Sequence, residues 1–531
     1  MDQNEFDYII IGAGSAGCVL ANRLSADPKV RVCVIEGGGK ESAPNVRVPA
    51  GILSLYGNPK YDYAYMSAPQ EHLNGRRIPV NRGKALGGSS SINSMLYVRG
   101  RPSDYDEWRD LGCAGWGWND VLPVFKDLED NRIGQSPALH GTGGELHVDR
   151  ARDPNPVDRM FIAAGRAVGL KENEDFNSEV QEGLGIYNVT QKDGLRWSSY
   201  RAFLDPVKNR PNLTILIHSE TRRILVGNGR ATGVEIAGED GIRTLSARRE
   251  VILTAGAIGS PTVLLRSGIG PGAMLKAAGV AVVHDLPGVG QNLRDHVDGM
   301  ITVRSASTKT LGLSLGNLPA MIAAPFQLLF ARKGMLETNY VEAGGFARTK
   351  YAGDEPDIQF HFVPGYRSHR DRLVEYGHGY AVHTCVLRPK SVGEIRLSPQ
   401  REIEIDQKFF SDPQDAKVLT EGIKIARAIF ADSAFDAIRG KEMLPGAEVA
   451  SDSQILDYLV SHATTVYHPV GTCKMGRDPL AVADPDTLKV HGIEGLRVAD
   501  ASIMPTLIGG NTNAPTMMIG ERCARMILGT L

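Results

Sequence analysis

The sequence has 531 residues, 42% hydrophobic and 23% charged, which is typical of a globular protein. The length fits about three units of roughly 150 residues, or equally a two-domain enzyme with a large cofactor domain. The formal net charge is −2 and no long basic run occurs, which argues against a nucleic-acid partner because phosphate binding needs a positive field.

The first residues, MDQNEFDY, contain neither a basic segment nor an apolar stretch, so we expect no secretion signal. The six cysteines form no Cys-x-x-Cys pair, which is typical of reduced thiols. The histidines form no His-Glu-x-x-His motif and no cluster with carboxylates, so no metal site is predicted. We therefore expect a cytoplasmic protein, with peripheral contact at the inner membrane as a second option.

The chain begins with a predicted strand–helix–strand unit. Residues 7–11 (DYIII) indicate a buried strand, and Gly12-Ala13-Gly14-Ser15-Ala16-Gly17 follows at once. The next segment has the apolar spacing of a helix and stops at Asp27-Pro28, before a second strand that ends in Glu36. Two strands joined by a helix predict a parallel sheet.

This unit carries the G-x-G-x-x-G pattern in the context that a dinucleotide requires. Gly12 permits a tight turn, Gly14 lets the backbone approach a pyrophosphate, and Gly17 lets the helix pack on the strand. The helix N-terminus offers free N–H groups to phosphate, and Glu36 can accept hydrogen bonds from ribose hydroxyls. The unit does not distinguish NAD from FAD, because both contain the same ADP half.

Two distant segments favour FAD. Residues 82–94 (RGKALGGSSSINS) are too distinctive for a linker, and their N–H and hydroxyl groups could surround a second phosphate or the flavin edge. Near the C-terminus, Asp500 follows a predicted strand and is a suitable acceptor for ribityl hydroxyls.

Further strands are predicted at 213–218, 230–236, 249–257, 383–389, 393–397 and 496–502, and a helix at the C-terminus. The apolar stretch 318–331 is shorter than the ~18 residues of a membrane span and contains Pro319, Pro325 and Gln327. It could line a hydrophobic entrance or rest on a membrane surface, but an ordinary buried helix is the favoured interpretation.

The predicted fold class is α/β with an interleaved second part. A discontinuous cofactor domain is expected from three stretches, and a substrate domain from two others. The first comprises 1–155, 200–300 and 455–531, and the second comprises 156–199 and 301–454.

Six ordered blocks between residues 6 and 530 resemble the glucose–methanol–choline (GMC) oxidoreductases, and within them the bacterial choline dehydrogenase-like alcohol dehydrogenases. The blocks are DYIIIGAGSAGCVLANRLS, NRGKALGGSSSINSMLYVRG, EVILTAGAIGSPTVLLRSGIG, DLPGVGQNLRDH, YHPVGTCKMG and RVADASIMPTLIGGNTNAPTMMIGER. The resemblance implies a Rossmann-type FAD-binding domain and a substrate domain built on an antiparallel sheet. It is much less specific for the substrate.

The resemblance also implies the cofactor site. Some members attach FAD covalently through a histidine at the position that resembles Ile92, which has no nucleophile, so non-covalent FAD is expected. Thr221 falls where backbone contacts to adenine are usual. The expected FAD-binding residues are Gly12, Gly14, Ser15, Ala16, Gly17, Glu36, Gly87, Gly88, Ser89, Asn93, Thr221, Ala255, Gly256, Asp500, Ala501, Thr512 and Asn513.

His468 and Asn511 fall at the family's catalytic pair. Alcohol oxidation removes a hydroxyl proton and an α-hydride, and histidine is the obvious base near neutral pH. Asn511 can donate a hydrogen bond to the developing alkoxide oxygen, and the spacing to the last helix favours it over Asn513. His296 is interpreted as structural and His462 as part of a helix surface.

The predicted reaction is oxidation of an alcohol, with electrons passed to a quinone or an artificial acceptor. The alternatives are a choline or sugar (sorbose-type) dehydrogenase and an oxidase that uses O₂, followed by a hydroxynitrile lyase. Aliphatic or aromatic primary alcohols rank first as substrates and sugars second. The sequence makes no prediction of the oligomeric state.

Overall fold

The N-terminal glycine motif lies at the carboxyl end of a central strand in a seven-stranded sheet. The computed structural model describes residues 4–366 and 375–531. The sheet order is β11 (Leu213–Leu216), β2 (Val32–Ile35), β1 (Glu5–Ile11), β14 (Gly241–Leu253), β13 (Arg230–Gly238) and β12 (Glu220–Gly227), and β25 (Leu496–Val498) pairs with β14.

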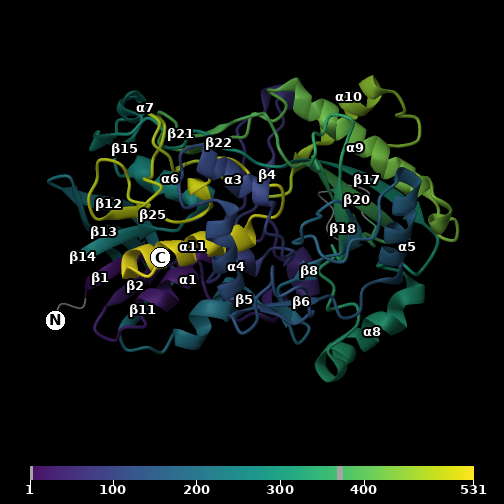
Figure 1. The fold of residues 1–531 in the computed structure, drawn as a ribbon, viewed down its shortest axis with the longest axis horizontal. Coiled ribbons are helices and arrows are strands. Elements are labelled where there is room, and N and C mark those ends of the chain that lie inside the picture. The colour runs from purple at the N-terminus through teal and green to yellow at the C-terminus, as the bar shows by residue number, and fades with distance from the viewer. Residues whose placement is uncertain (1–3, 367–374) are drawn as a thin grey trace.

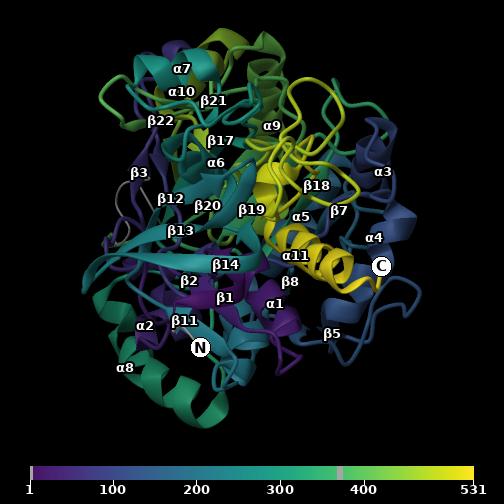
Figure 2. The same ribbon diagram turned by 90° about the vertical axis from the view of Figure 1, so that its left-hand side faces the viewer.

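The centre of this sheet is parallel. β1 pairs in parallel with β2 and β14, and α1 (Ser15–Leu24) connects β1 to β2, so the predicted strand–helix–strand unit is confirmed. β12 and β13 extend the sheet as an antiparallel hairpin, which the sequence did not specify. Figures 1 and 2 show α1 and the C-terminal helix α11 (Asn513–Leu528) against the strands.

Segments from opposite ends of the chain meet in this layer. The helices α1 and α11 pack closely because a Cβ at Gly520 would lie 2.8 Å from Cα of Ala16. The predicted C-terminal helix is therefore confirmed, and its first turn is brought to the glycine motif.

A second seven-stranded sheet is antiparallel. Its order is β23 (Lys441–Leu444), β17 (Val297–Ser305), β20 (His378–Val386), β19 (Ile358–Val363), β18 (Ala343–Ala347) and β7 (Gly183–Ile186), with β24 (Thr464–Thr465) beside β17. It is packed against α9 (Pro413–Ala431), α5 (Pro156–Ala164) and α10 (Asp452–His462) (Figure 1). The predicted antiparallel sheet is thus present. β17 begins inside the range 200–300 and β24 lies inside 455–531, both of which were predicted for the other domain.

Smaller elements connect the two sheets. The other helices are α2 (Pro44–Arg47), α3 (Pro102–Asp110), α4 (Trp118–Leu128), α6 (Gly256–Arg266) and α7 (Gly272–Ala277). The remaining strand pairings join β3 (Tyr65–Met66) to β4 (Pro79–Val80), β9 (Gln191–Lys192) to β10 (Leu195–Arg196), β15 (Ile269–Gly270) to β16 (His284–Asp285), β21 (Glu394–Leu397) to β22 (Ile403–Asp406), and β6 (Leu146–Arg150) to both β5 (Glu129–Asn131) and β8 (Asn188–Val189).

The apolar stretch 318–331 forms α8 (Leu318–Phe326), which continues in a wider last turn, η8 (Gln327–Ala331). The favoured prediction of a buried helix is wrong, because Ala324 and Leu328 are its only buried residues. α8 lies at the periphery in both views, outside the two sheets (Figures 1 and 2), so only one face meets the protein. Within the described residues, no helix has the length and hydropathy to cross a bilayer.

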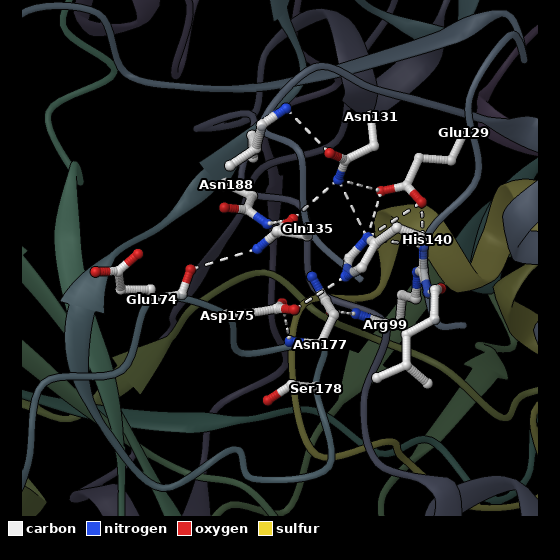
Figure 3. Close-up of polar contacts among 12 residues, drawn as sticks. Arg99, Glu129, Asn131, Gln135, His140, Glu174, Asp175, Asn177, Ser178 and Asn188 are labelled. Carbon is white, nitrogen blue, oxygen red and sulfur yellow. Dashed lines mark hydrogen bonds and ion pairs between the residues drawn. The ribbon is translucent and has the colours of Figure 1, made fainter. Parts of the chain in front are cut away.

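A buried ionic network joins the loop after the second glycine-rich segment to β5 (Figure 3). The Arg99 guanidinium and the Glu129 carboxylate form an ion pair that is completely shielded from solvent. His140 bridges Glu129 and Asp175, at 3.0 Å from a carboxylate oxygen of each. Burial opposes a charged imidazole, but Asp175 and Glu129 outweigh it and raise the pKa of His140.

Replacing Arg99 with Leu should lower the free energy of unfolding by about 3–5 kcal/mol, because the Glu129 carboxylate would be left buried without its main counter-charge. Urea denaturation measures the change. The matched control is Arg109→Leu, since Arg109 forms an ion pair with Asp106 on the surface, where water screens the charges, so a much smaller loss is expected. Equal losses in the two variants would show that the buried network does not stabilise the fold.

Candidate functional site

One deep cavity, with a volume of about 1930 Å³, extends between the two sheets. Gly12, Gly14 and Glu36 lie in its wall beside the parallel sheet, while His468 and Asn511 lie in its wall beside the antiparallel sheet. The volume exceeds the ~300–1,000 Å³ of a typical small-molecule site. It can therefore hold a large cofactor and a substrate together.

The glycine motif has the local geometry that its sequence predicts. Gly12 adopts φ +101°, and a Cβ there would lie 2.7 Å from the carbonyl oxygen of Thr254. A Cβ at Gly17 would lie 2.0 Å from the carbonyl oxygen of Gly12, so only glycine fits where the first turn of α1 packs against the motif. Gly14 begins α1 with no side-chain cap, so the positive end of the helix is open to the cavity.

Glu36 is held at the end of β2 by the backbone. Its two carboxylate oxygens accept hydrogen bonds from the amides of Ala13 (3.1 Å) and Gly38 (2.8 Å). Burial raises the pKa of Glu36 to about 7. Each oxygen keeps a lone pair for a hydroxyl donor, which fits the diol of a ribose.

The second glycine-rich loop touches the first. A Cβ at Gly88 would lie 2.8 Å from Cα of Gly14, so the second loop can approach the first this closely only with glycine at position 88. Gly88, Ser89 and Asn93 line the cavity. Gly87, with φ +93°, lies behind them and donates its N–H to the carbonyl oxygen of Ala13 (2.7 Å).

Two residues that the sequence did not single out support this loop. Arg196 is buried and donates to the carbonyl oxygen of Ser90 (3.0 Å) and to both oxygens of Asn93 (2.7 and 2.9 Å). Ser198 and Ser91 donate hydrogen bonds to the buried carboxylate of Glu41. Ile92 packs with Val46, Leu55 and Tyr61 and offers no nucleophile.

The remaining predicted cofactor residues lie in the same cavity wall. Asp500 accepts hydrogen bonds from the Gly256 amide (2.9 Å), the Ser260 hydroxyl (2.5 Å) and the Ser502 amide (2.8 Å), so the protein already uses much of its accepting capacity. Ser15 donates to the Asn513 side chain (2.7 Å). The other lining members of the predicted set are Ala16, Thr221, Ala255, Ala501 and Thr512.

His468 and Asn511 lie together, with Asn511 Nδ2 3.1 Å from His468 Nε2. His468 follows β24, after Tyr467 in the left-handed region (φ +67°). Its amide donates to Asp295 (2.8 Å), and Thr465 donates to the other oxygen of this carboxylate (2.6 Å). Asn511 precedes the first turn of α11.

Two further side chains extend this pair into a chain of hydrogen bonds. His296 Nδ1 lies 2.9 Å from His468 Nδ1, and His296 Nε2 lies 3.1 Å from the carbonyl oxygen of Leu387. On the other side, Gln359 donates to the Asn511 side-chain oxygen (3.1 Å). His296, predicted as structural, therefore contacts the proposed base directly. His462 is exposed, as predicted, at the end of α10 on the cavity rim.

The partners fix the tautomer of each imidazole. His296 Nε2 must carry a proton, because the Leu387 carbonyl can only accept. Neutral His296 therefore accepts at Nδ1, so His468 donates from its own Nδ1. The lone pair of His468 is left at Nε2, where it accepts from Asn511.

Both imidazoles are neutral around neutral pH. Burial lowers the pKa of His296 to about 3. Burial, with a further contribution from the Arg82 charge, lowers the pKa of His468 well below its ordinary range. The Nε2 lone pair is thus available as a proton acceptor.

The comparisons with known proteins agree with this geometry. The family model described as GMC oxidoreductase matches residues 6–298 with its N-terminal part and 389–520 with its C-terminal part. An alcohol dehydrogenase (acceptor) from Pseudomonas putida is 45% identical over 529 residues, which is 98% of this chain and 96% of the relative. An oxygen-dependent choline dehydrogenase from Sinorhizobium fredii is 43% identical over 530 residues, 98% and 95% of the two chains.

Solved structures give the same result. A pyridoxine 4-oxidase from Mesorbium loti has a TM-score of 0.88 at 32% identity, with 99% of each chain covered. A formate oxidase from Aspergillus oryzae has a TM-score of 0.91 at 28% identity, with 100% of this chain and 99% of the other covered. The chain belongs to the GMC oxidoreductase family, which confirms the resemblance predicted from its six sequence blocks.

Nitrogen NMR of isotope-labelled histidine should show neutral imidazoles for His296 and His468 at neutral pH, with the His468 proton on Nδ1 and the His296 proton on Nε2. The lowered pKa values should keep both rings neutral as the pH falls through the ordinary histidine range near ~6.5. Exposed His462 serves as the control. Protonation of His468 at neutral pH would contradict the derived tautomers.

Proposed function

We propose that this protein oxidises a neutral primary alcohol to the corresponding carbonyl compound with the help of FAD, and passes the electrons to a quinone or another acceptor. The observation that carries the proposal is the His468–Asn511 pair, whose Nε2 lone pair lies in the wall of the cavity that also contains the open end of α1. The alcohol dehydrogenase (acceptor) relative supports the choice of acceptor.

The residues present fit FAD on a Rossmann-type domain formed by 1–155, 200–300 and 455–531, with the substrate domain formed by 156–199 and 301–454. The α1 N-terminus would hold the pyrophosphate, and Glu36 would accept from the adenosine ribose. The backbone near Thr221, whose hydroxyl is buried without a hydrogen-bond partner, would meet the adenine. Gly88, Ser89 and Asn93 would hold the flavin, bound non-covalently because Ile92 offers no nucleophile.

When bound, FAD would accept the hydride from the alcohol carbon. His468 Nε2 would take the hydroxyl proton once the substrate hydroxyl replaces Asn511 Nδ2 as the hydrogen-bond partner of this lone pair. Asn511 Nδ2 would then donate to the developing alkoxide. His296 positions His468 by accepting from its Nδ1–H, and that hydrogen bond strengthens when the imidazole becomes positive.

The wall near the pair favours an apolar, uncharged substrate. Met300 and Val363 form a buried cluster with Tyr340, Val341 and Leu444, and all five line the cavity. The Arg82 guanidinium also lines the cavity, and it donates a hydrogen bond to the carbonyl oxygen of Tyr467 (2.6 Å), the residue before His468. A permanently cationic alcohol such as choline would be repelled by this charge.

Replacing His468 with Ala should slow anaerobic flavin bleaching by a primary alcohol about 10²–10⁴-fold, because the proton acceptor is removed. Asn511→Ala should slow it about 10²–10³-fold, since one donor to the alkoxide is lost. Stopped-flow absorbance measures both rates. The control is His462→Ala, which removes a rim imidazole and should keep the parent rate.

The same experiment tests the acceptor. After bleaching, rapid recovery of the yellow colour with a quinone and slow recovery in air are expected. Rapid recovery in air would indicate an oxidase instead. Parent-like bleaching of His468→Ala would show that another group takes the proton.

The charge preference is tested with a pair of substrates of equal shape. Choline and 3,3-dimethylbutan-1-ol differ in one central atom, nitrogen or carbon, and hence in one positive charge. We expect kcat/KM to be at least about tenfold higher for the neutral alcohol, because about 1.4 kcal/mol of repulsion gives that ratio. A ratio in favour of choline would identify a choline dehydrogenase and contradict the role given to Arg82.

A further inference from the structure

The surface around α8 is unusually apolar for a protein in water. Of the 18 large hydrophobic side chains that are exposed in the described part of the chain, six lie within residues 315–330. Four of them, Leu318, Ile322, Phe326 and Phe330, follow one another at intervals of four residues. That spacing places them in one stripe on the outer face of the helix.

The opposite face of α8 belongs to the cavity. Met321, Ala324 and Pro325 line it, together with Leu311 and Leu313 from the preceding loop. The helix therefore separates the cavity from the surroundings with one apolar face directed to each. Whatever covers the outer stripe therefore lies across this helix from the cavity lining.

The charges that flank the stripe have one sign. Lys309, Arg332 and Lys333 are the ionisable side chains between residues 306 and 336, and this stretch contains no Asp or Glu. Lys309 and Lys333 are exposed. The whole chain carries a net charge of −2, so this cationic border is a local feature.

We propose that α8 and η8 dock on the surface of a lipid bilayer that contains anionic headgroups. An apolar stripe bordered by lysine and arginine is the pattern of a helix that lies in the membrane interface. Fourteen residues are too few to span the hydrocarbon core, which needs about 20, so the helix lies along the surface. Docking of this kind brings the cavity next to alcohols and quinones dissolved in the bilayer.

The test uses the purified full-length flavoprotein and vesicles of phosphatidylcholine with or without phosphatidylglycerol. Co-sedimentation should occur with the anionic vesicles and should weaken as salt screens the cations. The triple variant Phe326→Ser, Leu329→Ser, Phe330→Ser should bind at least about tenfold more weakly, because it loses most of the inserted apolar area. Lys309→Glu with Lys333→Glu should lose the preference for phosphatidylglycerol.

Two controls separate docking from other effects. Val180→Ser with Ile242→Ser removes two well-exposed apolar side chains elsewhere and should bind vesicles like the parent. Bleaching by a water-soluble alcohol should be the same in the triple variant, since the cavity lining does not include the three replaced residues. Vesicle binding is read without turnover, so it is independent of the proposed reaction.

Three results would overturn the proposal. The first is a parent protein that stays in solution with anionic vesicles at low salt, and the second is a triple variant that binds them as the parent does. The third comes from sedimentation velocity without lipid. If the parent is a dimer and the triple variant is a monomer, a second copy of the chain covers the stripe instead of a membrane.

Discussion

A chain of hydrogen bonds with a single direction crosses the cavity wall where the two sheets meet. It runs from the Leu387 carbonyl through His296, His468 and Asn511 to Gln359. Because Leu387 can only accept, every later donor and acceptor is determined, and the basic nitrogen of His468 faces Asn511. The proposed chemistry depends on this order, since the other tautomer would present a proton where a lone pair is needed.

Burial keeps the donors and acceptors of this hydrogen-bond chain in the same order. It lowers the pKa of both imidazoles, so in the absence of substrate neither is protonated from solvent near neutral pH, and no hydrogen bond is reversed. Asp295, whose pKa burial raises to about 6, fixes the His468 backbone through its amide. His468 is therefore held by hydrogen bonds to its ring and to its main chain.

The cavity connects this centre with two different surroundings. At one end two glycine-rich loops touch, because Gly88 has no side chain to hold them apart, and the free end of α1 lies beside them. At the other end α8 presents one apolar face to the cavity and one to the exterior. A polar cofactor and an apolar substrate thus suit opposite ends of the same space.

The sequence by itself determined the local features. These are the strand–helix–strand unit, the tight turn at Gly12, the close helix packing at Gly17, the C-terminal helix, and the family through its ordered motifs. These depend on neighbours along the chain, where spacing and backbone freedom are visible.

The tertiary structure decided what depends on distant residues. The contact of His296 with His468 joins positions far apart in sequence, and the ion pair of Arg99 with Glu129 does the same. The exposure of α8 was also not predictable, because an apolar composition favours burial but does not say whether a second layer of protein exists to cover the helix.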